Sequence, residues 1–110
     1  MNVLATLDDL MRTEGQAELI AGRIVRFPPH GHFPAVLAGR IRRSLFDYAE
    51  LLGRGQSYGG TVGFVFPALA NGRESFCADA AYYTGPPPAN PMHFIPGPPD
   101  FAVEVRSDSL

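Results

Sequence analysis

The sequence predicts one α+β domain over residues 1–110, in which a short helix, a β-hairpin and a long amphipathic helix precede three strands of one mixed or antiparallel sheet. Three observations predict this class. Apolar residues recur at helical spacing over one long stretch, the other apolar runs are short and rich in β-favouring residues, and there is neither an internal repeat nor a βαβ alternation. An apolar content of 45% in 110 residues supplies one core and leaves no room for a second domain.

The first element is a short helix between Thr6 and Arg12. Threonine caps helices well, and the two aspartates that follow lie in the first turn, where the helix dipole favours negative charge. Two apolar runs come next, at residues 18–20 and 23–27, and Gly22 between them can take the positive φ of a tight turn. These runs predict a β-hairpin.

The long helix is predicted from Phe33 to Leu52, where apolar residues recur at spacings of three and four over five turns. Gly53 is a typical helix terminator. Much of the remaining face carries charged residues, including Arg40, Arg42 and Arg43. We interpret the helix as an amphipathic cover packed on a sheet, in preference to a helix that reads DNA.

Three further strands are predicted in the rest of the chain. Residues 56–67 and 73–83 form two of them, joined near Asn71-Gly72, and residues 101–106 form the last. The proline-rich stretch between Thr84 and Pro99 has no helical or strand period, so we expect a long surface loop there.

Charge and composition bound the cellular setting. The formal net charge of −2 argues mildly against non-specific nucleic-acid binding, and all nine basic residues are arginine, so no lysine is available for catalysis. The single cysteine excludes an internal disulfide, and no leader-like segment or apolar run of about 20 residues is present. We expect a cytoplasmic protein with no membrane role.

Asp79 and Glu104 stand out because each is an acid within an otherwise apolar strand. Two acids on adjacent strands can converge on a divalent cation, which prefers hard oxygen ligands. Strand alternation alone would equally place both acids on the wet face of a half-exposed sheet, without any function. Spacing leaves these two interpretations open.

Three ordered blocks resemble a known family. They are the Glu-Leu-Ile-Ala-Gly-Arg-Ile-Val hairpin that begins at Glu18, the strand that holds Asp79, and Pro-Asp-Phe-Ala-Val-Glu-Val-Arg-Ser at residues 99–107. Together they are similar to bacterial restriction-endonuclease-like proteins of the PD-(D/E)xK nuclease superfamily, from Thr6 onward. The resemblance implies a restriction-endonuclease-like core and a metal-dependent endonuclease that hydrolyses DNA phosphodiester bonds.

The same resemblance implies roles for individual residues. Asp79 and Glu104 would bind Mg²⁺ or Mn²⁺, the main-chain carbonyl of Val105 would be a third ligand, and Glu18 would line the same site. Arg106 occupies the position of the superfamily's usual lysine. It could contact the phosphate, but an arginine is a poor general base because it stays protonated.

Two departures from the family pattern bear on activity. Ala78 precedes Asp79 where relatives more often have proline, and the chain ends at Leu110 where relatives continue into a helix with a further basic residue. The chain is then either a truncated nuclease or a catalytically inactive remnant that acts as an oligomeric or protein-interaction module. In both cases we expect a second copy to cover the exposed sheet face, in a homodimer or higher homo-oligomer.

Other chemistry-bearing residues have simpler interpretations. His30, His32 and His93 lack a cysteine or acid cluster at zinc-ligand spacing, so we interpret them as exposed loop residues, with His32 the one that could approach a substrate. Cys77 lies in an apolar strand and is expected to be an inert core residue. The strand tyrosines are expected to pack in the sheet: Tyr58, Tyr82 and Tyr83.

Overall fold

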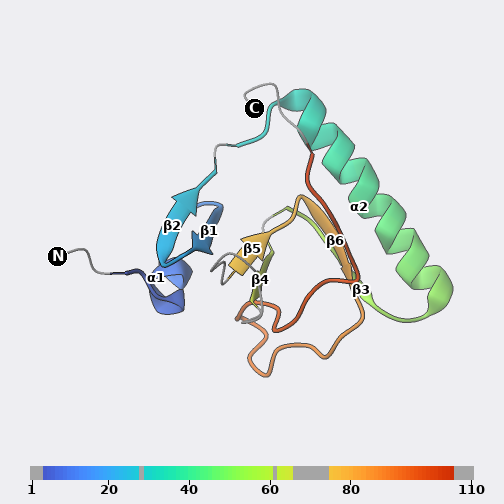
Figure 1. Ribbon diagram of the computed structural model, residues 1–110. Coiled ribbons are helices and arrows are strands. Elements are labelled where there is room, and N and C mark those ends of the chain that lie inside the picture. Colours follow the sequence, from blue (N-terminus) through green and yellow to red (C-terminus); the bar gives the residue numbers. More distant parts are fainter. Residues whose placement is uncertain (1–3, 28, 61, 66–74, 106–110) are drawn as a thin grey trace.

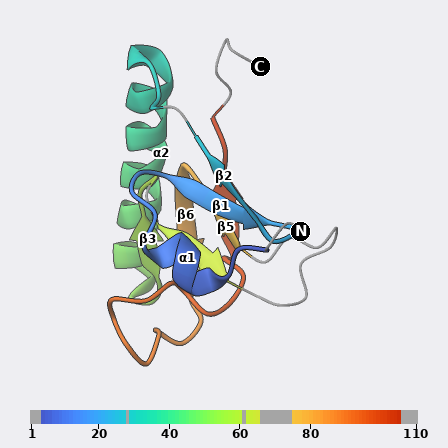
Figure 2. The ribbon, with the colours of Figure 1, turned by 90° about the vertical axis from the view of Figure 1, so that its left-hand side faces the viewer.

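A computed structural model describes residues 4–27, 29–60, 62–65 and 75–105 of the chain. Figures 1 and 2 show a short helix and a hairpin on one side of a group of short strands, and a long helix along the other side. The elements follow the predicted order, and the α+β class is confirmed.

The N-terminal elements follow from local sequence. Helix α1 (Leu7–Met11) begins after Thr6, whose side chain accepts a hydrogen bond from the Asp9 N–H while the Asp9 carboxylate accepts one from the Thr6 N–H. This reciprocal cap satisfies two donors that the helix cannot pair internally, and the Thr6 bonds hold the pKa of Asp9 below its ordinary value. Strands β1 (Ala17–Ile20) and β2 (Arg23–Arg26) form the predicted hairpin.

The long helix is confirmed as α2 (His32–Leu52), which ends at Gly53 with a left-handed φ of 70°. It packs against strands β3 (Gln56–Tyr58) and β6 (Ala80–Tyr83), as Figure 1 shows. Within α2 only Ala49 is buried. The helix is therefore a cover on the sheet, as predicted, but a cover that leaves many of its apolar side chains in contact with solvent.

The two strands predicted at residues 56–67 and 73–83 are each interrupted, and this part of the prediction is wrong. The first gives β3 and β4 (Gly63–Val65), and the second gives β5 (Ser75–Cys77) and β6. The interruptions lie at Gly59-Gly60 and at Ala78-Asp79. These two segments lie opposite each other, between the paired strands β3-β6 and β4-β5. Glycine weakens a strand because it has no side chain to pack, and Asp79 directs its carboxylate to a neighbouring backbone.

The described strands form three small antiparallel sheets. The prediction of one mixed sheet is therefore wrong. The sheets are β1-β2, β3-β6-β7 and β4-β5, where β7 spans Phe101–Val103. Strand β6 is central, with Ser57 opposite Tyr82 on one side and Ala81 opposite Ala102 on the other. The two interruptions explain why the strands form separate sheets. They lie opposite each other, so both strands of the β3-β6 pair end where the β4-β5 pair has not yet begun.

Two clusters of buried side chains make up the core. Phe64, Ala81, Tyr83 and Ile95 belong to the larger one, and Leu19 belongs to a smaller one shared by α1 and the hairpin. Tyr83 and Tyr82 are buried, which confirms the packing role predicted for the tyrosines. The proline-rich segment forms no helix or strand, as predicted, but its Ile95 is buried and makes a bridge to Phe64.

Candidate functional site

Asp79 lies at the interruption between β5 and β6, with its side chain only 10% exposed. Its N–H donates to the Val103 carbonyl at 2.8 Å, and its Oδ2 accepts from the Val105 N–H at 2.5 Å. These two bonds hold Asp79 against the chain on both sides of Glu104. The bond from the Val105 N–H restricts the orientation of the carboxylate.

Glu104 directly follows β7 and is exposed. The structure therefore brings the two predicted metal-binding residues onto adjoining chain segments, one acid buried and the other at the surface. Val105, whose carbonyl is the third predicted ligand, is half-buried beside them. Arg106 lies outside the described residues.

His30 contacts Asp79 from the loop before α2. Its Nε2 lies 3.3 Å from Asp79 Oδ1, and its side chain is 29% exposed. His30 is an exposed loop residue, as predicted, but its imidazole also contacts Asp79, which was not predicted. His32 begins α2 and is exposed, and His93 lies 3.1 Å from the Asn90 amide. The only signal for His30 in the sequence was its place just before the long helix.

A hollow of about 290 Å³ opens beside Asp79, beneath the N-terminal half of α2. It carries a carboxylate, an imidazole, a guanidinium and an amide, and its other walls are glycine and alanine. The lining residues are Gln16, His30, Ala35, Ala38, Gly39, Arg42, Gly59, Gly60 and Asp79. Small residues leave space for a ligand, while the polar groups can orient it.

Glu18 has a structural contact that the sequence did not reveal. The side chain is buried at 3% exposure in β1, and its Oε2 accepts a hydrogen bond from the Cys77 N–H at 3.0 Å. It does not belong to the lining of the hollow beside Asp79. Glu18 instead joins the hairpin to the strand that leads to Asp79.

The donor atoms at Asp79 suit a hard cation. Among the residues that the structure describes, no three His, Cys, Asp or Glu side chains gather in a group that could hold a metal ion. Magnesium commonly binds through one or two carboxylates and keeps several waters. The oxygen donors of Asp79, Glu104 and the Val105 carbonyl therefore fit Mg²⁺ or Mn²⁺ in chemical type.

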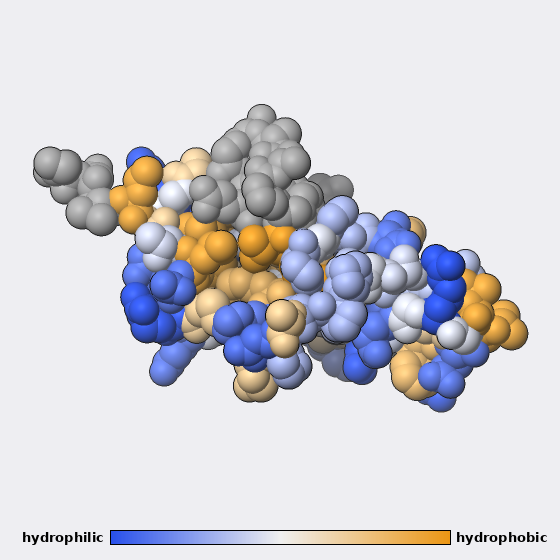
Figure 3. Space-filling view, turned by 90° about the horizontal axis from the view of Figure 1, so that it is seen from below, coloured by the Kyte–Doolittle hydropathy of each residue, from blue (hydrophilic) through white to orange (hydrophobic). Residues whose placement is uncertain are grey.

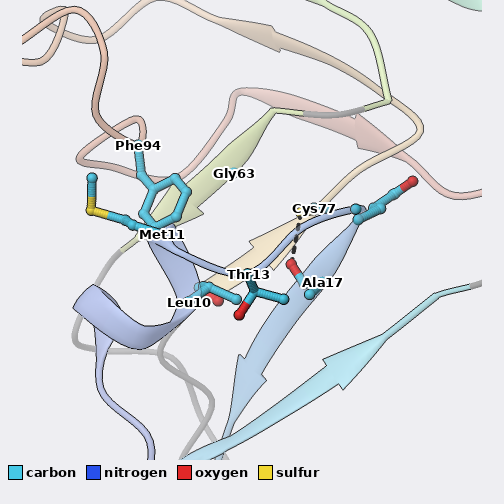
Figure 4. A pocket seen from close by; sticks show the side chains of 10 residues that line it. Leu10, Met11, Thr13, Ala17, Gly63, Cys77 and Phe94 are labelled. Carbon is cyan, nitrogen blue, oxygen red and sulfur yellow. Dashed lines mark hydrogen bonds between the residues drawn. The ribbon is translucent and has the colours of Figure 1, made fainter.

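A second hollow, of about 350 Å³, lies between α1 and the β4-β5 sheet. Figure 4 shows Met11 and Phe94 toward one end of it and a hydrogen bond between Cys77 and Ala17 toward the other. The Cys77 thiol donates to the Ala17 carbonyl at 3.3 Å and is half-buried, so the prediction of a core cysteine is only partly correct. This hollow is largely apolar, and its thiol is already engaged.

Comparisons with known proteins point in one direction. The sequence model of the Uma2 family, described as "Putative restriction endonuclease", matches residues 4–110. Neither the curated proteins nor the solved structures contain a match. Within the described residues, no helix has the length and apolar character needed to cross a membrane.

Proposed function

The chain belongs to the Uma2 family, and on this basis we propose that it is a metal-dependent endonuclease that hydrolyses DNA phosphodiester bonds. One observation carries the proposal. The Asp79 carboxylate is buried and accepts a hydrogen bond from the Val105 N–H, while the Asp79 N–H donates to the Val103 carbonyl, and the residue lies next to a hollow with polar walls. Family membership supports DNA as the substrate class, and this arrangement supports the choice of residues.

Asp79 and Glu104 would hold Mg²⁺ or Mn²⁺, with the Val105 carbonyl as a third ligand. When bound, such an ion polarises the scissile phosphate and lowers the pKa of the attacking water. Arg106 would contact the phosphate. Glu18 would assist from a distance, because its bond to the Cys77 N–H supports β5 two residues before Asp79.

His30 has a positioning role in this proposal. In the tautomer that carries its proton on Nε2, the imidazole donates to Asp79 Oδ1. The other carboxylate oxygen is already engaged by the Val105 N–H. Contacts at both oxygens restrict rotation of the carboxylate, so its lone pairs stay directed toward the adjoining space.

Plasmid nicking tests the proposal. Purified wild-type chain should relax supercoiled plasmid in MgCl₂ or MnCl₂ and not in EDTA. Asp79→Asn and Glu104→Gln should abolish relaxation while circular dichroism stays unchanged. Asp47→Asn and Glu50→Gln, which remove exposed acids of α2, are matched controls that should cleave normally. Absence of metal-dependent cleavage by the wild type would refute the activity.

The alternative is a catalytically inactive remnant that acts as an oligomeric or protein-interaction module. Exposed apolar side chains on α2 favour it, since Leu51 is 85% exposed and Phe46 is 47% exposed. Figure 3 shows hydrophobic residues at the end of the molecule where the C-terminal half of α2 lies. Calorimetric titration separates the two functions: a remnant should show no Mg²⁺ or Mn²⁺ binding that Asp79→Asn or Glu104→Gln removes.

A further inference from the structure

Among the described residues that line the hollow beside Asp79, Arg42 is an arginine that has no role in the proposed function. Arg42 lies on α2 and lines the hollow together with Asp79 and His30. Among the described residues it has neither a carboxylate partner nor a hydrogen bond, whereas Arg12 pairs with Asp9. A guanidinium that is not neutralised at the wall of a polar hollow is available to an anionic ligand.

Two adjacent glycines bring Arg42 and Asp79 to the same place. A Cβ at Gly59 would lie 3.1 Å from Arg42 Cδ, and a Cβ at Gly60 would lie 3.5 Å from the Asp79 carbonyl oxygen. The side chain of Arg42 therefore lies against Gly59, and the backbone of Asp79 lies against the next residue, Gly60. A larger residue at Gly59 would press on the stem of Arg42.

Charge balance shows what such an arginine could do. A phosphodiester that approaches Asp79 and Glu104 meets two carboxylates, which repel it unless cations intervene. Arginine stays protonated at any physiological pH, and its planar fork of N–H donors matches two phosphate oxygens. The chain has no lysine to share this task.

We propose that Arg42 is a phosphate-contacting residue of this site, whose guanidinium binds non-bridging oxygens of the DNA phosphodiester that enters the hollow beside Asp79. DNA as the ligand rests on the proposed function. Arg42 is a different residue from Arg106, and it reaches the site from α2 instead of from the chain beyond β7.

Neighbouring arginines of α2 provide matched controls. Successive helical residues are rotated by about 100°, so Arg43 and Arg40 project in different directions from Arg42. All three arginines are exposed, and Arg42 alone of them lines the hollow. The three glutamine substitutions remove the same charge from one helix, and only one of them removes it from the hollow.

The first measurement is DNA binding without metal, by fluorescence anisotropy of a fluorescein-labelled duplex in EDTA over a series of NaCl concentrations. Each phosphate contact contributes about 0.9 to the slope of log K against log salt. Arg42→Gln should make the slope shallower by about that amount. Arg42→Lys should keep the wild-type slope because it keeps the charge. Arg43→Gln and Arg40→Gln should also leave it unchanged.

The second measurement is cleavage in MnCl₂. Arg42→Gln should lower kcat/KM for plasmid nicking by at least about tenfold, as expected for loss of one donor to a developing charge, and Arg42→Lys should recover part of it. If the wild type does not cleave but its salt slope still depends on Arg42, the nuclease function fails and the phosphate contact stands. The inference is overturned if the wild type binds no duplex, if Arg42→Gln leaves the slope unchanged, or if the control substitutions reduce it equally.

Discussion

The carboxylate of Glu18 in β1 accepts a hydrogen bond from the main-chain N–H of Cys77 in β5 at 3.0 Å. Next to it, the Leu19 N–H donates to the Ser75 hydroxyl at 2.7 Å, and the Cys77 thiol donates to the Ala17 carbonyl. The hairpin and the β4-β5 sheet are separate sheets, so side chains make the connection that a shared strand ladder would otherwise make.

Glu18→Ala should therefore destabilise the fold. Loss of an acceptor for a buried donor costs about 1–3 kcal/mol, so the free energy of unfolding in urea should fall by about that amount. Glu18→Gln should cost less, because its amide oxygen can still accept the bond. Glu14→Ala removes an exposed acid before β1 and should have little effect. If Glu18→Ala and Glu14→Ala lower the free energy of unfolding equally, the hydrogen bond between Glu18 and Cys77 does not stabilise the fold.

Asp79 has a structural role that can be separated from its proposed chemistry. Asp79→Ala leaves the Val105 N–H without its carboxylate acceptor and should lower the free energy of unfolding by about 1–3 kcal/mol. Asp79→Asn keeps an oxygen at that position and should be closer to the wild type in stability. Thermal unfolding followed by circular dichroism measures both. A less stable Asn variant than Ala variant would contradict this geometry.

Gly55 should tolerate alanine less well than Gly53. Both have left-handed φ, of +88° and +70°, so alanine is strained at either position. A Cβ at Gly55 would also lie 2.5 Å from the ring of Tyr82, whose hydroxyl donates to the Arg54 carbonyl, while a Cβ at Gly53 meets nothing within 4 Å. Gly55→Ala should cost at least about 1 kcal/mol more than Gly53→Ala in urea unfolding. Equal costs would mean that Tyr82 moves aside freely.

Acid stability should depend on the contact between Thr84 and Asp100. The Thr84 hydroxyl donates to Asp100 Oδ2 at 2.7 Å and its N–H donates to Oδ1 at 2.9 Å, and these bonds lower the pKa of Asp100 below its ordinary value. Because the folded-state pKa is lowered, the stabilisation is present above the unfolded-state pKa. It is lost as pH falls through the folded-state pKa, below about pH 4.

Thr84→Val should thus lose less stability on acidification below about pH 4 than the wild type loses, in urea midpoints measured over a pH series. Thr13→Val is the matched control. The Thr13 hydroxyl donates to the Asp9 carbonyl, which does not titrate, so its removal should shift the midpoint equally at every pH. Parallel pH profiles for the wild type and Thr84→Val would contradict the assignment.

From the sequence, an oligomer was expected through an exposed sheet face. Because Phe46 and Leu51 are exposed, we predict self-association through the C-terminal end of α2. Wild-type chain should sediment as a dimer or larger species, and Phe46→Ser with Leu51→Ser should shift it toward the monomer. Phe33→Ser removes a side chain that is 71% exposed at the opposite end of α2, and it should leave the sedimentation coefficient unchanged. If the wild type sediments as a monomer at all concentrations, the prediction of an oligomer is wrong.

The sequence by itself determined the elements that depend on near neighbours. The Thr6 cap, the hairpin around Gly22 and the helix that ends at Gly53 were all predicted, because capping, backbone φ and apolar spacing are decided within a few residues. Asp79 and Glu104 were recognisable because each is an acid within an apolar stretch of sequence. Their expected place inside strands was wrong, since Asp79 lies between β5 and β6 and Glu104 directly follows β7.

Only the tertiary structure decided how the strands divide and what surrounds Asp79. The interruption at Gly59-Gly60 matters because it faces the one before β6, and Glu18 is buried because β5 lies beside it. His30 and Arg42 reach Asp79 from the loop before α2 and from α2 itself. These contacts join residues tens of positions apart, and neither spacing nor composition contains the packing that brings them together.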